Sequence, residues 1–148
     1  RSQVWLVQPS YVSSDFNKTN TTLADVTGLT ADVLDFQEYK FEANLRVSQS
    51  AGGGGKFSIQ GTCIPVEIWF EVQLTDNTTD TFSIADLQPS FASSAGQTGT
   101  TDGYCKITGY VRTDDGGGGT LTVGYAQNAA SGTSTVKKGS TFTVTQVN

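Results

Sequence analysis

The 148-residue chain contains no histidine and only two cysteines. Without an imidazole, every serine or cysteine mechanism that uses histidine as its base is excluded, and the commonest transition-metal ligand is missing. One disulfide bond is the most that two cysteines allow, which is too few for a cysteine-stapled fold. Cys63 and Cys105 either form that bond, if their strands are neighbours, or remain two buried thiols.

The chain also lacks a basic patch and a long apolar run. Nine lysines and arginines against fourteen acidic residues give a net charge of -5, which repels nucleic acids and anionic membranes. No run approaches the roughly eighteen apolar residues of a membrane-spanning helix. We therefore expect one domain with neither a nucleic-acid nor a membrane partner.

Alternating apolar and polar residues predict strands. Residues 39–47 place apolar side chains at odd positions and polar ones at even positions, which is typical of a strand with one wet face. Residues 64–74 do the reverse, so Glu67, Trp69 and Glu71 share the polar face. Further strands are expected at residues 4–7, 23–33 with a break near Gly28, 56–60, 81–84, 104–112, 120–126 and 133–147. A long loop is expected at 88–103, and no helix is expected anywhere. The sequence therefore predicts an all-β, antiparallel, jelly-roll-like β-sandwich with eight or nine strands.

Two glycine-rich segments interrupt these strands. In SQSAGGGGKFSIQG, residues 48–61, a phosphate-binding loop would need glycine at Ser50 and a hydroxyl residue at Phe57. It would also need a following helix, whereas residues 56–60 alternate like a strand. LRVSQSAGGGGKFSI can be aligned with GYVRTDDGGGGTLTV. We therefore expect two glycine-tipped β-hairpins.

Acidic residues form no convincing catalytic or metal site. Glu67 and Glu71 project from one strand face about 13 Å apart, beyond the usual separation in either class of glycosidase. Pairs from different strands, such as Asp86 with Glu42, depend on the fold. The DNTTD segment at 76–80 lacks the spacing of a calcium loop. The sequence predicts no catalytic residue, no metal and no cofactor.

Aromatic residues on polar faces are the remaining binding candidates. Trp69 lies between two glutamates, and Trp5 and Tyr110 also lie on or near polar stretches. Such rings stack against sugars, or they are buried at a subunit interface or against a second sheet. Asn77 and Asp80, in a neighbouring loop, are candidate ligand-binding residues beside them.

Two parts of the chain, roughly residues 20–61 and 104–147, resemble a β-sandwich module of tailed-bacteriophage virion proteins. The shared patterns are an LxxVTGL opening, YxFEAxLxV, a glycine-rich hairpin, and a closing GGTLTVxxAQN followed by TVxxGSxFxVT. The residues that carry the resemblance are Leu23, Val26, Thr27, Gly28, Leu29, Tyr39, Phe41, Glu42, Gly119, Thr120, Leu121, Thr122, Val123, Ala126, Gln127, Asn128, Gly139, Ser140, Phe142 and Val144.

The resemblance implies a non-enzymatic protein on the virion surface, in a head decoration or appendage or in a tail fibre or spike. It also implies a symmetric homo-oligomer, most readily a trimer, bound to a phage capsid or tail protein. Residues 1–19 lie outside the family-like part and are expected to form an N-terminal strand or anchor segment, with residues 20–148 as a single sandwich domain. The alternative is a carbohydrate- or receptor-binding module that attaches to a host surface glycan.

Overall fold

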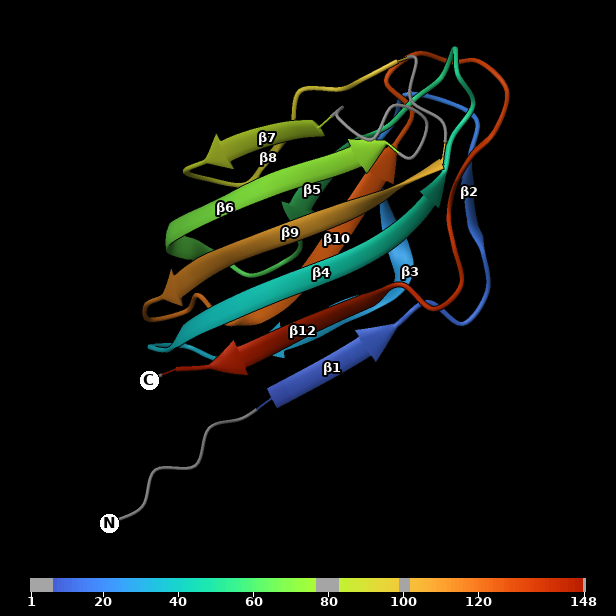
Figure 1. Cartoon of the computed structure of the whole chain (residues 1–148). Helices are drawn as coiled ribbons and strands as arrows, with labels where there is room; N and C mark the ends of the chain where they lie inside the picture. The colour runs from blue at the N-terminus through green and yellow to red at the C-terminus, as the bar shows by residue number, and fades with distance from the viewer. Residues whose placement is uncertain (1–6, 77–82, 99–101, 148) are drawn as a thin grey trace.

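The longest strands follow the alternating segments of the sequence. The structure, a computed structural model, describes residues 7–76, 83–98 and 102–147. β4 (Glu38–Ser48) buries its odd-numbered side chains, and β6 (Pro65–Asp76) buries its even-numbered ones from Ile68 onward. β9 (Asp102–Thr113) pairs antiparallel with both over almost its whole length. These three strands form the centre of the larger sheet (Figure 1).

Short strands complete this sheet at both sides of the centre. Its main path runs β1-β12-β4-β9-β6-β7. β1 (Val7–Tyr11) and β12 (Thr141–Gln146) lie on one side, and β7 (Ser83–Gln88) lies on the other. β11 (Ser134–Val136) pairs with the end of β4 and with β2 (Phe16–Lys18). Among the described residues, β1 and β7 are therefore the edge strands of the main path, and β2 forms a further edge beyond β11.

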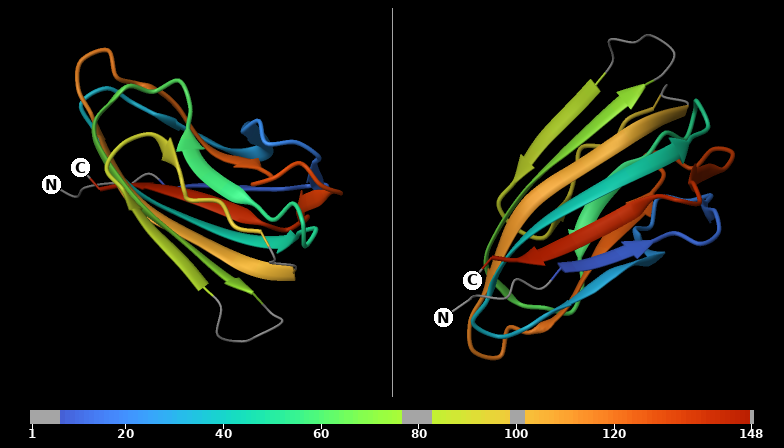
Figure 2. Two further views of the ribbon diagram at one scale, coloured as in Figure 1. Left: turned by 90° about the horizontal axis from the view of Figure 1, so that it is seen from above. Right: turned by 60° about the horizontal axis from the view of Figure 1, so that its bottom comes forward.

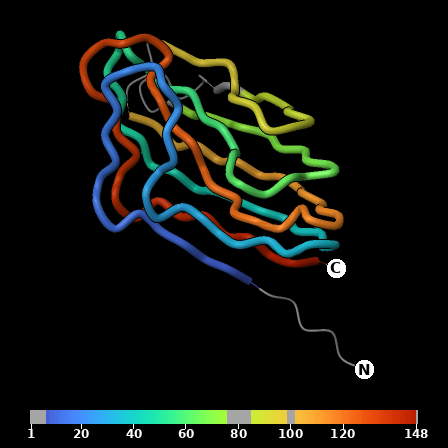
Figure 3. The backbone as a smooth tube through the Cα atoms, turned by 180° about the vertical axis from the view of Figure 1, so that it is seen from behind, coloured from blue at the N-terminus to red at the C-terminus, as the bar shows by residue number. Residues whose placement is uncertain are grey.

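A smaller sheet covers one face of the larger one. Its order is β3-β10-β5-β8, with β3 (Ala24–Val33), β10 (Gly119–Ala126), β5 (Lys56–Gln60) and β8 (Ala92–Ser93). The two layers are visible from above and from behind (Figure 2, Figure 3). Apolar side chains of both sheets fill the space between them, and the largest fully buried ones are Tyr39, Tyr125, Phe57, Phe70, Phe142, Leu29, Leu45, Ile59, Ile68, Leu74, Ile107 and Leu121.

Both glycine segments connect the two sheets, so the hairpin predictions are wrong. Residues 49–55 lead from β4 in the larger sheet to β5 in the smaller one, and residues 114–118 lead from β9 to β10 in the same sense. The crossings lie at opposite ends, because β4 and β9 are antiparallel. Alternation predicted the strands on either side, but the same glycines serve a hairpin turn and a crossing between layers. The sequence similarity of the two segments thus reflects two equivalent crossings.

The all-β antiparallel sandwich is confirmed, and its strands differ in detail from the prediction. The described residues form twelve strands instead of the predicted eight or nine. The prediction missed β2, β8 and β11, because each has only two or three residues and lacks a clear alternating pattern. Residues 133–147 form two strands, and β8 lies within the expected loop at 88–103. The break near Gly28 is a shift in register between β3 and β10, with Gly28 at a φ of 99°. Residues 4–6 and 81–82 lie outside the described residues.

The N-terminal segment, expected to form a strand or anchor, contains two strands of the larger sheet. β1 pairs along its full length with β12, and β2 pairs with β11. Residues 7–18 therefore contribute strands to the larger sheet, and residues 1–6 lie outside the described residues. The anchoring role expected of residues 1–19 stays a prediction.

Candidate functional site

The outer face of the larger sheet brings two predicted aromatic residues together. Trp69 on β6 is the direct cross-strand partner of Tyr110 on β9, and Tyr110 is in turn the partner of Lys40 on β4. Directly opposed side chains have Cβ atoms about 5 Å apart. The side chain of Trp69 is 44% exposed, and that of Tyr110 is half-buried. These three residues form one row across the strands, which we call the aromatic row.

A second row lies beside the first, two residues along each strand. Thr108 on β9 pairs with Glu42 on β4 and with Glu71 on β6, and Glu71 also pairs with Leu87 on β7. We call Glu42, Thr108 and Glu71 the polar row. The two carboxylates flank Thr108 from strands about 10 Å apart, two strand spacings. Sequence reasoning did not select this pair because only the position of β9 between β4 and β6 brings the two together.

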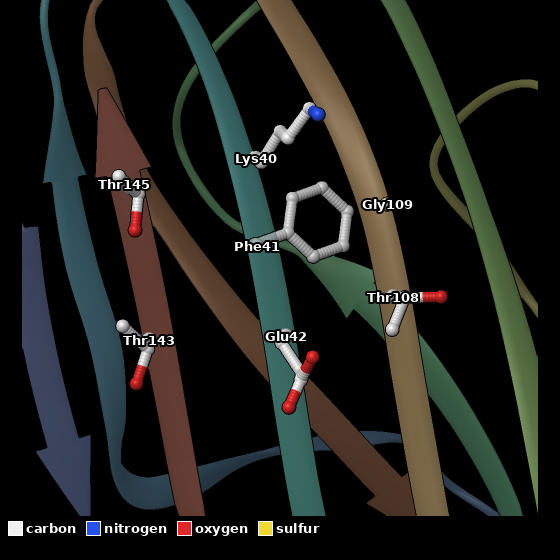
Figure 4. A pocket seen from close by; sticks show the side chains of 7 residues that line it. All are labelled: Lys40, Phe41, Glu42, Thr108, Gly109, Thr143 and Thr145. Carbon is white, nitrogen blue, oxygen red and sulfur yellow. The ribbon is translucent and has the colours of Figure 1, made fainter. Parts of the chain in front are cut away.

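Two shallow depressions lie along these rows. One has a volume of about 470 Å³ and is lined by Lys40, Phe41, Glu42, Thr108, Gly109, Thr143 and Thr145 (Figure 4). The other has a volume of about 310 Å³ and is lined by Trp69, Phe70, Glu71, Leu87, Thr108, Gly109 and Tyr110. They share Thr108 and Gly109 on the central strand. The two depressions are therefore neighbours on one continuous face.

Gly109 lines both depressions and has no side chain to cover the apolar core beneath them. It is the cross-strand partner of Phe41 on one side and Phe70 on the other, both directed toward the core. A Cβ atom at Gly109 would meet Phe41 Cζ at 2.5 Å and would also contact the carbonyl oxygen of Trp69. Figure 4 shows the Phe41 ring directed from β4 toward Gly109. The aromatic rings thus fill the space of the missing side chain and form the floor of both depressions.

Hydrogen bonds hold several side chains of this face in place. The Tyr110 hydroxyl donates to Glu38 Oε1 over 2.6 Å. Partial burial, followed by this bond and the negative charge of Glu38, raises the pKa of Tyr110 to about 12. In the polar row, Asn44 Nδ2 donates to Glu42 Oε2 over 2.9 Å. The face is therefore a fixed array of ring surfaces and hydrogen-bonding groups on rigid strands.

The other predicted site residues are not brought into this face. Trp5, Asn77 and Asp80 lie outside the described residues. Asp86 belongs to the inner side of β7, where its Oδ2 accepts a hydrogen bond from the Ala95 N–H, whereas Glu42 faces outward. The two acids therefore form no pair. Glu67 and Glu71 do share the outer face of β6, as predicted, and Arg112 Nε lies 4.0 Å from Glu67 Oε1.

Both cysteines are free, buried thiols, so the disulfide alternative is wrong. Cys105 is paired with Leu45 and Leu74 near the start of β9, and Cys63 donates its backbone N–H to Thr120 O near the opposite end of the sandwich. The start and end of β9 are separated by roughly 25 Å or more. Burial raises the pKa of the Cys63 thiol to about 11 and raises that of Cys105 further.

An exposed apolar cluster lies at the end of the sandwich where β9 finishes. Leu34 and Phe36 precede β4, and Ile64 and Val66 lie around the start of β6, all of them between 52% and 67% exposed. Thr113 links the two segments, since its hydroxyl donates to Leu34 O and its strand position is paired with Pro65. Phe36 has a φ of 57°, in the left-handed region that non-glycine residues seldom adopt. We call these four apolar residues the apolar tip.

Across residues 7–76, 83–98 and 102–147, no group of three or more histidine, cysteine or acidic side chains is arranged to hold a metal ion. Within the same ranges there is no helix long and apolar enough to cross a membrane.

No known protein family and no curated protein matches the chain. Among solved structures, Eiger TNF from S. frugiperda is similar over 99% of this chain and 94% of its own, with 8% identity and a TM-score of 0.46. The VP2 subviral particle of infectious bursal disease virus is similar over 96% of this chain and 40% of its own (11% identity, TM-score 0.26). A family two carbohydrate esterase from Cellvibrio japonicus is similar over 93% of this chain and 35% of its own (12% identity, TM-score 0.28).

The chain therefore spans about two fifths of the viral capsid protein and about a third of the esterase. All three TM-scores lie below 0.5, so these likenesses carry no argument about function. The fold class rests on the strand pairing described above.

Proposed function

We propose that this protein is a non-enzymatic structural subunit on the surface of a tailed-bacteriophage virion. In this role it belongs to a head decoration or appendage, or to a tail fibre or spike, and it assembles as a homotrimer. The resemblance of residues 20–61 and 104–147 to the virion module supports the setting. The structure contributes a surface suited to assembly.

The apolar tip is the observation that carries this proposal. Four large apolar side chains from two separate segments are exposed at one end of the sandwich. An exposed apolar group that is rimmed by polar loops is typical of a surface that packs against another chain. Asp35 fixes the loop between Leu34 and Phe36, because its carboxylate accepts hydrogen bonds from the Gly116 and Gly118 N–H groups. The loop is therefore ordered before any partner binds.

Immunogold electron microscopy of intact particles tests the virion role. An antibody raised against the isolated chain is expected to label either the heads or the tails of the phage that encodes it. Label on heads identifies a decoration or appendage, and label on tails identifies a fibre or spike domain. Particles that carry no label, from a lysate in which the soluble chain is detected, would overturn the proposal.

A further inference from the structure

We propose that the two depressions on the outer face form one groove that binds an uncharged oligosaccharide, whose sugar rings stack on Trp69 and Tyr110. The groove runs across β12, β4, β9, β6 and β7. Four strand spacings give it a length of about 19 Å, which suits a short linear chain. This inference does not depend on the virion role, since a sandwich of this shape could bind a glycan in any setting.

The aromatic row supplies the stacking surface. Trp69 and Tyr110 are direct cross-strand partners, so their rings stand side by side on the outer face. The C–H face of a pyranose ring packs against such rings, because an aromatic side chain offers a large apolar surface at little entropic cost. The hydrogen bond from Tyr110 to Glu38 fixes the hydroxyl at the edge of the ring and does not involve the faces of the ring.

The polar row supplies partners for the sugar hydroxyls. Glu42 and Glu71 accept hydrogen bonds and Thr108 both donates and accepts them, while Lys40 of the neighbouring aromatic row donates, so these groups can satisfy hydroxyls in either role. Within the described part of the chain, the side chains of Lys40 and Glu71 carry no hydrogen bond or ion pair. Asn44 orients Glu42 and is itself held by the Tyr104 hydroxyl over 2.6 Å. Glu42 is thus positioned before the ligand arrives, whereas Lys40 and Glu71 are available to bind it.

Charge selects among the possible occupants. One lysine and two glutamates line the groove, and the whole chain carries a net charge of -5, so an anionic glycan or a nucleic acid is repelled. The core of a protein interface is depleted in charged residues, whereas here three charged side chains lie at the centre of the groove. An uncharged sugar fits both features, because it brings hydroxyls for the charged groups and C–H faces for the rings.

Fluorescence of Trp69 provides a direct readout. The chain has two tryptophans, so the full chain carrying Trp5→Phe reports on Trp69 alone. Maltohexaose, cellohexaose and chitohexaose serve as uncharged probes, and an oligogalacturonate of similar length serves as the anionic comparator. We expect saturable binding of at least one uncharged probe, with a change in Trp69 emission and a matching calorimetric titration. Failure of all three, or tighter binding of the oligogalacturonate, would overturn the inference.

Variants in the wild-type background locate the site. Trp69→Ala and Tyr110→Ala should each weaken binding by about tenfold or more, as expected for the loss of an aromatic anchor. Tyr11→Ala is the matched control, because Tyr11 is a 65%-exposed aromatic residue on β1 of the same sheet but lines neither depression. Its affinity should be unchanged.

Two further outcomes would contradict the groove. Binding that survives Trp69→Ala unchanged would place the sugar elsewhere. Loss of self-association in Trp69→Ala, together with no sugar binding by the wild-type chain, would show that this face is an interface between copies. Thermal unfolding of each variant separates a lost contact from a lost fold.

Discussion

At the scale of single residues, the side chain of Gln127 forms four hydrogen bonds. It is fully buried, and its Nε2 donates to Ser131 O, Gly132 O and Ser134 Oγ, while its Oε1 accepts from the Ser131 N–H. Ser134 in turn donates to Gly54 O in the first glycine crossing. A single amide thus ties the loop before β11 to the connection between the sheets.

We expect Gln127→Ala to lower the free energy of unfolding by about 2 to 3 kcal/mol, because it leaves buried partners unsatisfied and opens a cavity. Gln73→Ala is the matched control, since Gln73 is exposed on the outer face of β6, and its effect should stay within about 0.5 kcal/mol. Urea denaturation monitored by fluorescence measures both. Equal effects of the two substitutions would contradict the role assigned to Gln127.

The two buried thiols make the free energy of unfolding depend on pH in the alkaline range. The ordinary thiol pKa of 9.0 is raised to about 11 for Cys63 by burial, so the folded state keeps a proton that the unfolded state releases. This contribution is complete below pH 9 and is lost as the pH rises toward 11. We expect the free energy of unfolding to fall over that interval, and less steeply in Cys63→Ala.

A thiol count checks the free state directly. The native chain should react slowly with a thiol reagent at neutral pH, and two thiols should react after denaturation without reductant. No reactive thiol after denaturation would show a disulfide and contradict the structure.

At the scale of elements, the glycine crossings depend on close backbone approach. Gly54 has a φ of 55°, and a Cβ atom there would collide with the carbonyl oxygen of Gln97. Gly116, in the second crossing, has a φ of 75° but no atom within 4 Å of such a Cβ. Alanine substitutions at these two positions therefore distinguish the cost of a steric clash, at Gly54, from the cost of the left-handed backbone conformation alone, at Gly116.

We expect Gly116→Ala to cost about 1 kcal/mol, the penalty for a left-handed alanine, and Gly54→Ala to cost about 3 kcal/mol or more, since backbone atoms must move. Chemical denaturation of both variants measures the difference. Comparable losses would mean that the contact between Gly54 and Gln97 does not constrain the crossing.

The strands were largely predictable from sequence, whereas their partners were not. Residues 39–47 and 104–112 became the cores of β4 and β9, because a period of two fixes which side chains are buried. Alternation contains no information on the neighbouring strand. The sequence pattern therefore predicts two hairpins where the chain crosses from one sheet to the other. The same limit applied to the site: Trp69 and Tyr110 were each selected for their polar surroundings, but their contact depends on the register between β6 and β9.

At the scale of the whole molecule, the apolar tip and the groove lie on different parts of the surface. The tip belongs to the end of the sandwich where β9 finishes, and the groove crosses the outer face of the larger sheet. Copies that meet through the tip would leave the groove exposed. The protein could therefore assemble and bind a glycan at the same time.

We expect the double substitution Phe36→Ser and Ile64→Ser to disrupt assembly without unfolding the chain, because both side chains are exposed and contribute little to the core. Tyr11→Ser and Val7→Ser together provide the control, since these residues are similarly exposed but lie on the edge strand β1. Loss of assembly in the control pair alone would move the interface from the tip to the edge of the sheet.

Sedimentation velocity of the isolated 148-residue chain tests the central claim most directly. Three copies of a 15.6 kDa chain give a species of about 47 kDa, which the account predicts for the wild type over a range of concentrations. The double variant Phe36→Ser and Ile64→Ser should sediment as a single chain. A wild-type protein that remains a 15.6 kDa monomer at high concentration would contradict the proposal of a self-assembling virion subunit.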